Sequence, residues 1–402
     1  MAQESRAKNN QLRQGGVRTT WLYVLLGLLF FPVLLGLYVI RARWYGWVIF
    51  LLSLGAMIWV LRKKLWYRRR MLLCLLLCLL LALTGLYAAR PQQDVSFQGQ
   101  LTTGLLSFIL ELPLDERVRS GSIFSDISSV WQPPEGYGYR ETTWLSLRLE
   151  LLTAPENPDG RLVIQYHGGA FVAGLNDMYR GFAVAYSQKA GGADVLTVDY
   201  RLAPTYPYPA QQRDAMTAWT FATRALGYQP EKIVLCGDSA GGNLALYMGL
   251  RLRDLKAALP AAIVAFSPWA DLSNSGESHI SNARLDPNFG VGSSAAYDAS
   301  PVGVSTTYPD GLDATDPYIS PSYGDYTGLC PILLQAGSIE LLLSDSEMVK
   351  ANCDAVGTPC VLSVYNGMFH VFQALMDMTP ESKAAWAEYG AFAQRALNIE
   401  KE

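Results

Sequence analysis

The pattern of apolar and polar positions divides the chain into two regions near residue 90. Before that point, three long uncharged apolar runs cover residues 20–40, 44–61 and 71–89, and basic residues separate them. As helices, runs of this length match the hydrocarbon core of a bilayer, which is about 30 Å thick. The pattern therefore predicts three transmembrane helices over 20–90, preceded by a basic tail at 1–19.

The charges of this region predict an orientation. The tail holds four basic residues and the stretch between the second and third runs holds six, whereas Arg41 and Arg43 alone separate the first two runs. Lysine and arginine concentrate in the cytoplasmic loops of membrane proteins. The expectation is a multi-pass protein of the plasma membrane, anchored through its N-terminal helices, with the domain after residue 90 on the extracytoplasmic side.

From residue 144 onward, short β-rich runs alternate with amphipathic segments. Strands are predicted at 144–152, 161–166, 193–198, 232–236, 261–266, 331–335 and 360–365, and helices at 177–190, 209–226, 239–257, 344–356 and 380–397. Such alternation is typical of a mainly parallel sheet covered by helices on both faces. We therefore predict an α/β domain over 144–402.

One predicted strand ends in a serine between glycines. Residues 237–241 read Gly-Asp-Ser-Ala-Gly, with an apolar strand before them and a helical segment after them. A serine on a strained turn from strand to helix is the arrangement of a nucleophile elbow, where flanking glycines relieve crowding. An ordinary turn could have the same composition, but the flanking elements favour Ser239 as a nucleophile, with Asp238 in a supporting role.

A second glycine motif follows the strand at 161–166. Residues 167–171 read His-Gly-Gly-Ala-Phe, and we expect His167 to hold this loop by hydrogen bonds. Asp199 and Arg201, at the end of another apolar strand, are expected to form a buried pair that braces the loop, since buried charges must be paired. Backbone N–H groups are predicted to form an oxyanion hole at Gly168, Gly169, Ala170 and Ala240.

Together, these motifs resemble those of the hormone-sensitive-lipase-like family of α/β-hydrolases. The likeness extends over about residues 145–397 and includes Asp-Tyr-Arg-Leu-Ala-Pro at 199–204, Ser-Pro-Trp-Ala-Asp-Leu at 267–272, Tyr-Ile-Ser-Pro at 318–321 and Met-Phe-His-Val-Phe at 368–372. The family usually has a third glycine where Ala170 stands. The resemblance implies an α/β-hydrolase fold and a helical cap built from 91–143, with a contribution from 273–315 left open.

The chain contains three histidines. His279 lies in a polar stretch and is expected at the surface, like most residues of such loops. His370 follows the last strand, in agreement with the order of serine, acid and histidine in α/β-hydrolases. A neutral imidazole can take the proton of Ser239 and return it to a leaving alcohol, so His370 is predicted to be the base.

The acid is expected between the serine and the histidine, just after a strand. Glu340 follows the strand at 331–335, and the resemblance places the catalytic acid of the family at this position, more often as aspartate. Asp345 is the alternative acid, although it falls inside the next predicted helix and could instead cap or orient it. An ionised acid would fix the tautomer of the histidine.

These residues predict a serine carboxylic ester hydrolase that acts through an acyl-enzyme on short- to medium-chain acyl esters. A deacetylase or lipase of the same mechanism, and an inactive ligand-binding homologue, remain alternatives. A net charge of −3 gives no reason to expect nucleic acid as a partner. Three scattered histidines offer no metal-ligand spacing, and no cofactor is predicted. Whether Cys353 and Cys360 form a disulfide is left open.

Overall fold

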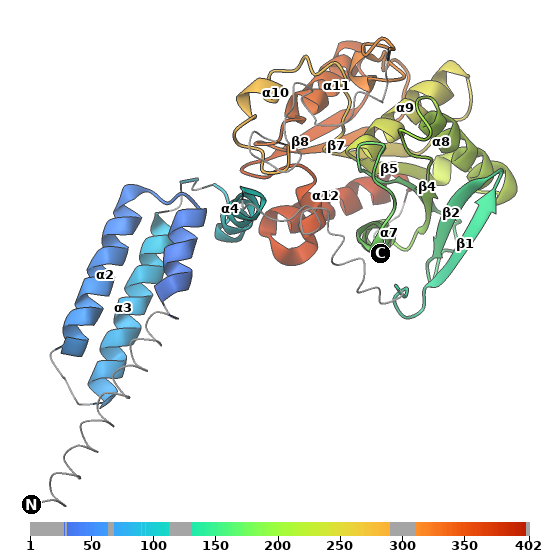
Figure 1. Ribbon diagram of the computed structural model, residues 1–402. Coiled ribbons are helices and arrows are strands. Elements are labelled where there is room, and N and C mark those ends of the chain that lie inside the picture. The colour runs from blue at the N-terminus through green and yellow to red at the C-terminus, as the bar shows by residue number, and fades with distance from the viewer. Residues whose placement is uncertain are drawn as a thin grey trace, which may run out of the picture. The chain divides into compact units, whose positions relative to one another are not determined.

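The computed structural model describes residues 28, 30–62, 68–89, 91–92, 94–111, 131–289 and 311–398. The chain divides into two compact units, residues 1–108 and 109–402 (Figure 1). The predicted basic tail at 1–19 and the first residues of the apolar run at 20–40 lie outside the described residues.

The first unit is built from helices. Residues 30–39 are helical, and α2 (Trp44–Arg62), α3 (Arg68–Ala88) and most of α4 (Phe97–Glu111) follow. Apolar side chains are buried between these helices at Phe30, Val33, Leu37, Ile40, Phe50, Met57, Ala82 and Leu86. Other large apolar side chains of the same helices, such as Leu51, Leu77 and Leu80, are exposed.

The predicted membrane spans are not found in the described part of the chain. No helix there combines the length and the apolar character that crossing a bilayer requires. The prediction of three transmembrane helices at 20–40, 44–61 and 71–89 is therefore wrong, and with it the predicted membrane anchor and multi-pass plasma-membrane location. α3 starts at Arg68 and so carries three arginines in its first turn, and many of the apolar side chains pack helix against helix.

The second unit contains an eight-stranded sheet with the strand order β1-β2-β4-β3-β5-β6-β7-β8. Its strands are β1 (Gly138–Trp144), β2 (Leu147–Thr153), β3 (Leu162–Tyr166), β4 (Asp194–Asp199), β5 (Ile233–Asp238), β6 (Ala262–Phe266), β7 (Ile332–Gly337) and β8 (Cys360–Tyr365). β2 pairs antiparallel with β1 and β4, and all other neighbours are parallel. The predicted mainly parallel sheet is confirmed.

One predicted strand differs from the structure. The run at 144–152 contains the last residue of β1, a turn and most of β2, because Leu145 and Ser146 have positive φ angles of 48° and 68° and turn the chain between the two strands. β1 therefore begins at Gly138, inside the segment expected to form a cap. Exposed and half-buried residues make up this edge strand, which explains why its apolar pattern was too weak to indicate it.

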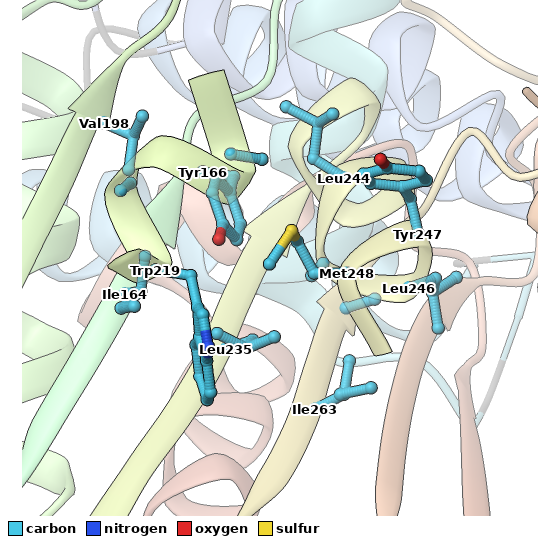
Figure 2. Close-up of a cluster of buried hydrophobic side chains, with 14 of the residues drawn as sticks. Ile164, Tyr166, Val198, Trp219, Leu235, Leu244, Leu246, Tyr247, Met248 and Ile263 are labelled. Atoms are coloured by element: carbon cyan, nitrogen blue, oxygen red, sulfur yellow. The ribbon is translucent and has the colours of Figure 1, made fainter. Parts of the chain in front are cut away.

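Helices cover both faces of the sheet, as predicted. α7 (Asp177–Lys189) and α12 (Pro380–Ala396) pack on one face, and α8 (Ala210–Thr220), α9 (Ala240–Asp254) and α11 (Leu343–Val356) pack on the other (Figure 1). Alternate residues of each strand point to opposite faces. Figure 2 shows the α9 side, where Leu244 and Met248 belong to the same buried cluster as Ile164, Leu235 and Ile263 from the strands.

The helical cap stays a prediction. The described parts of 91–143 comprise α4, the loop at 131–137 and β1, while residues 112–130 lie outside the described residues. Of 273–315, the structure describes residues 273–289, which include the short helix α10 (Ser278–Ser281), and residues 311–315.

The parallel strands bring the predicted chemistry to one edge of the sheet. β3, β5, β7 and β8 run in the same direction, so the loops that follow them meet beyond their carboxyl ends, where α/β proteins bind their ligands. These loops carry the residues from His167, Ser239, Ser338 and Asn366 onward.

The packing of α12 generates a test of stability. Trp386 is 2% exposed, its ring lies 5.3 Å from that of Phe266, and its Nε1 donates to the Gln373 carbonyl at 2.9 Å. Trp386→Ala should lower the free energy of unfolding by about 3–5 kcal/mol, because it leaves a cavity under the sheet. Chemical denaturation measures this loss, and Met378→Ala, at a site 71% exposed just before α12, should lose less than about 1 kcal/mol.

Candidate active site

Ser239 lies on a tight turn between β5 and α9. Its backbone has φ 53° and ψ −121°, a left-handed conformation that a residue with a side chain adopts only when its surroundings impose it. Three backbone hydrogen bonds hold it: its N–H donates to the Phe266 carbonyl at 2.9 Å, and its carbonyl accepts from Trp269 N–H at 3.0 Å and from Asn243 N–H at 3.1 Å. Ser239 is therefore fixed at the N-terminus of α9, a position that favours negative charge.

Both glycines of this turn are required by close backbone contacts. A Cβ atom on Gly241 would lie 2.0 Å from the Tyr166 carbonyl oxygen, and one on Gly237 would lie 2.2 Å from the Gly241 carbonyl oxygen. No side chain fits at such distances. The first turn of α9 thus sits directly against the end of β3, where the second glycine motif begins.

The loop after β3 turns sharply. Gly169, Ala170 and Phe171 have positive φ angles of 107°, 55° and 64°. The Gly168 N–H donates to Asp238 Oδ1 at 3.2 Å, which corrects the prediction that this group is a free oxyanion donor. In the described part of the chain, no hydrogen bond engages the N–H groups of Gly169, Ala170 and Ala240.

His167 is enclosed within this loop. Its ring stacks on Tyr200 with centroids 4.1 Å apart, and its Nδ1 lies 2.7 Å from the Gly168 carbonyl oxygen. The Tyr200 hydroxyl donates to the His167 carbonyl at 2.6 Å. Burial lowers the pKa of His167 to about 4, so the imidazole is neutral at pH 7.

Asp238 connects the two motifs. Besides Gly168 N–H, its carboxyl group accepts from the Tyr179 hydroxyl at 3.3 Å. Burial raises the pKa of Asp238 to about 7, and these two donors oppose the rise. Asp238, directly before Ser239, therefore holds the loop that follows β3 in place.

On the other side of the site, His370 and Glu340 lie together. The distance between His370 Nδ1 and Glu340 Oε2 is 4.0 Å, which is longer than a hydrogen bond. Both side chains are buried. Burial lowers the pKa of His370 to about 3 and raises that of Glu340 above its usual range, while the Ser267 hydroxyl and the backbone at Gly337 oppose the rise for Glu340.

Ser267 joins the acid to the loop of the histidine, a role that sequence reasoning missed. Its hydroxyl donates to Glu340 Oε2 at 2.7 Å and accepts from Val371 N–H at 3.0 Å. Its own N–H donates to the Gln335 carbonyl in β7 at 2.7 Å. The sequence offered one signal, the position of Ser267 directly after β6 at the edge where the other loops meet.

The second candidate acid has other partners. Asp345 lies in the first turn of α11, its Oδ2 accepts from Ala270 N–H and Asp271 N–H at 2.9 and 2.8 Å, and its Oδ1 lies 2.9 Å from His279 Nε2. His279 is 1% exposed, so its expected surface position is wrong. The polar composition around His279 comes from buried hydrogen bonds rather than from contact with solvent.

The expected pair of Asp199 and Arg201 is also wrong. Arg201 Nη2 binds Asp214 Oδ1 at 2.7 Å, and Asp214 Oδ2 also accepts Arg201 N–H at 2.9 Å. Asp199 instead pairs with Arg148, whose Nε lies 3.6 Å from Asp199 Oδ2. Arg201 lies two residues beyond the end of β4, and its side chain reaches Asp214 in α8, whereas Asp199 lies beside Arg148 of β2. The two side chains therefore do not meet.

Cys353 and Cys360 are free thiols in the structure. Cys353 is buried at the end of α11, and Cys360 begins β8. Their side chains are close enough to interact, which raises the pKa of Cys353.

Asp238 makes stability depend on pH. With a pKa of about 7 when folded against an ordinary 3.8, the folded protein binds more protons between these values, so stability falls as pH rises from about 4 to 7. The expected slope reaches about 1.4 kcal/mol per pH unit. Asp238→Asn should remove this contribution, as urea denaturation at pH 5 and pH 8 can measure. A difference between variant and wild type that is the same at both pH values would contradict it.

Known proteins are similar to this chain in sequence and in fold. Residues 163–374 match the model of a family described as alpha/beta hydrolase fold. The chain is 35% identical over 242 residues to an acetyl-hydrolase of Streptomyces hygroscopicus, covering 60% of this chain and 78% of the relative. It is 33% identical over 233 residues to an esterase of Acinetobacter venetianus, covering 58% and 74%.

Solved structures of esterases also resemble this chain. A crystal structure of an esterase from the bacterial hormone-sensitive lipase family has a TM-score of 0.65 at 31% identity, covering 75% of this chain and 99% of that one. An esterase/lipase from an uncultured bacterium has the same TM-score at 28% identity, with the same coverage. The chain therefore belongs to the hormone-sensitive-lipase-like family of α/β-hydrolases, and it is a carboxylic ester hydrolase.

Proposed function

We propose that the protein cleaves short- to medium-chain acyl esters through an acyl-enzyme on Ser239, with His370 as general base and Glu340 as the acid that orients it. The observation that carries this proposal is the 4.0 Å approach of His370 Nδ1 to Glu340 Oε2, at the sheet edge where Ser239 stands on its left-handed turn. Asp345 is the weaker candidate for the acid, because both of its oxygens are engaged by His279 and by backbone N–H groups.

In the first step, the Ser239 hydroxyl attacks the ester carbonyl carbon. With Nδ1 directed at Glu340, the other ring nitrogen of His370, Nε2, is left to accept the serine proton. Burial keeps the imidazole neutral, as a base must be. Glu340 stabilises the resulting imidazolium, and the 4.0 Å gap closes to a hydrogen bond as charge develops, since catalytic hydrogen bonds are often long in the free enzyme.

The oxygen that becomes negative is held by backbone N–H groups of Gly169, Ala170 and Ala240. Each such donor lowers the barrier by about 3 kcal/mol in related chemistry. Collapse of the tetrahedral intermediate breaks the bond to the alcohol, which takes its proton from His370. Water then enters, gives a proton to His370 and attacks the acyl group, so that the acid is released and Ser239 is regenerated.

Similarity to other proteins supports the proposed acyl range. One relative is an acetyl-hydrolase, and one structural neighbour, 28% identical with a TM-score of 0.65, was soaked with p-nitrophenyl butyrate. These acyl groups have two and four carbons. An acetyl ester of a larger alcohol is the second candidate substrate, on the strength of the first of these relatives.

Three substitutions test the assignment of roles in the full-length protein. Ser239→Ala and His370→Ala should each lower kcat for p-nitrophenyl butyrate by about 10⁴-fold or more, because each removes a group that acts in the chemical step. Glu340→Gln should lower kcat by about 10²–10⁴-fold, through loss of the negative charge beside the imidazole. Steady-state kinetics on variants with unchanged circular dichroism measure these losses.

Glu347→Gln provides the matched control, since Glu347 is exposed on α11 and lies near Glu340 in sequence; it should retain wild-type kcat. Substantial turnover by folded Ser239→Ala, together with no labelling of Ser239 by a phosphonate probe in the wild type, would refute the acyl-enzyme. Wild-type kcat in Glu340→Gln combined with a large loss in Asp345→Asn would reassign the acid.

The acyl range is tested with p-nitrophenyl esters of two to twelve carbons. We expect kcat/KM to be highest among the shorter chains and to decline toward twelve carbons, because a pocket that fits a short acyl group gains nothing from further methylenes outside it. A steady rise of kcat/KM up to twelve carbons would instead identify a lipase.

A further inference from the structure

A short segment beyond α10, residues 282–289, contacts the loops that carry Glu340 and His370. The segment is made of turns and irregular backbone, with no helix. Its central buried residue is Asp286, which is 4% exposed. We name residues 282–289 the acid–base clamp. The sequence motifs did not single it out, and nothing in the proposed chemical steps uses it.

The clamp first holds the acid. Asn282 Nδ2 donates to the Glu340 carbonyl at 2.8 Å and to the Ser338 carbonyl at 3.2 Å. Asp286 Oδ2 accepts from the Leu341 N–H at 2.8 Å. The backbone on both sides of Glu340 is therefore bonded to one segment that lies more than 50 residues earlier in the chain.

The same segment then holds the base. Asn288 Nδ2 donates to the His370 carbonyl at 3.0 Å, and the ring of Phe289 lies 4.6 Å from the His370 ring at an interplanar angle of 59°. Asp286 Oδ1 fixes both residues, because it accepts from Asn288 N–H at 2.8 Å and from Phe289 N–H at 3.3 Å.

One carboxylate thus connects the two loops. Oδ2 of Asp286 faces the acid loop, and Oδ1 faces the residues that touch the base. A buried carboxylate is costly unless its oxygens are hydrogen-bonded, and here three backbone N–H groups satisfy it. Packing alone does not require these hydrogen bonds, since apolar residues could fill the same volume.

We propose that Asp286 and Asn288 are positioning residues that set the distance between Glu340 and His370. This inference rests on the proposed function, in which Glu340 orients His370 as the base. The pair is not in hydrogen-bond contact, at 4.0 Å, and makes no direct bond that would align it. Its alignment therefore depends on the backbones of the two loops, which the clamp and Ser267 tie together.

The test compares kcat and KM for p-nitrophenyl butyrate in the full-length protein. Asn288→Ala removes the donor to the His370 carbonyl, and we expect kcat to fall roughly tenfold to hundredfold with KM within twofold, because misplacing a catalytic group by about 1 Å has effects of this size. Asp286→Asn, in which an amide replaces one acceptor oxygen, should do the same. The double variant should lose less than the product of the two single losses, as expected for residues that act through one link.

Asn352→Ala is the matched control. Its amide also donates to backbone carbonyls, of Ser322 at 2.7 Å and Gly324 at 3.3 Å, but between α11 and a loop away from the pair. It should change melting temperature without changing kcat at 25 °C. Asn288→Asp, which keeps the size and removes the donor, provides a second variant at the same position, and circular dichroism verifies folding of each protein.

The possible outcomes distinguish a failure of the clamp proposal from a failure of the proposed function. Wild-type kcat in folded Asn288→Ala or Asn288→Asp, in an assay where His370→Ala abolishes turnover, overturns the clamp and leaves the proposed function intact. Turnover by His370→Ala in that assay instead overturns the proposed function and the clamp with it. A loss in kcat as large in Asn352→Ala as in Asn288→Ala would also overturn the clamp, because general destabilisation would then explain both.

Discussion

The contact of the first turn of α9 with the end of β3 is the constraint on which the site depends. The space between Gly241 and the Tyr166 carbonyl has no room for a single carbon atom, since a Cβ would lie 2.0 Å from the oxygen. This contact places the turn of Ser239 and the glycine loop side by side in one rigid arrangement. Asp238 then adds a hydrogen bond to Gly168 from within the turn itself. Nucleophile and oxyanion loop are therefore positioned by the same few backbone contacts.

The acid and the base are held in a different way. Glu340 and His370 come from loops after β7 and β8, and the bonds that align these loops reach back to Ser267 and to the clamp at 282–289. Close backbone packing sets the first half of the site, and side-chain hydrogen bonds set the second. Loops held by a few polar contacts can shift slightly between steps, as a 4.0 Å pair must if it is to close.

This difference explains what could be predicted from the sequence. Strands and helices of the second unit followed from apolar periodicity, and the turn at Ser239 followed from the Gly-Asp-Ser-Ala-Gly motif between a strand and a helix. The partners of His279 and Arg201 lie in other elements, at Asp345 and Asp214, and composition of a single stretch carries no information on them. In the first unit, apolar runs of suitable length predicted membrane spans, but run length alone does not report where a helix starts or what covers its faces.

Buried carboxylates surround this site at Asp238, Asp286, Glu340 and Asp345, each less than 5% exposed. Burial raises the pKa of each one, so each is held at a cost in stability that an apolar residue would not incur. Three of them accept backbone N–H groups from loops at the sheet edge. A carboxylate offers two oxygens in fixed directions and can thereby orient two loop segments at once, whereas an apolar side chain fills space without defining direction. The fold thus gives up stability at these positions in exchange for loops whose orientation around Ser239 is defined.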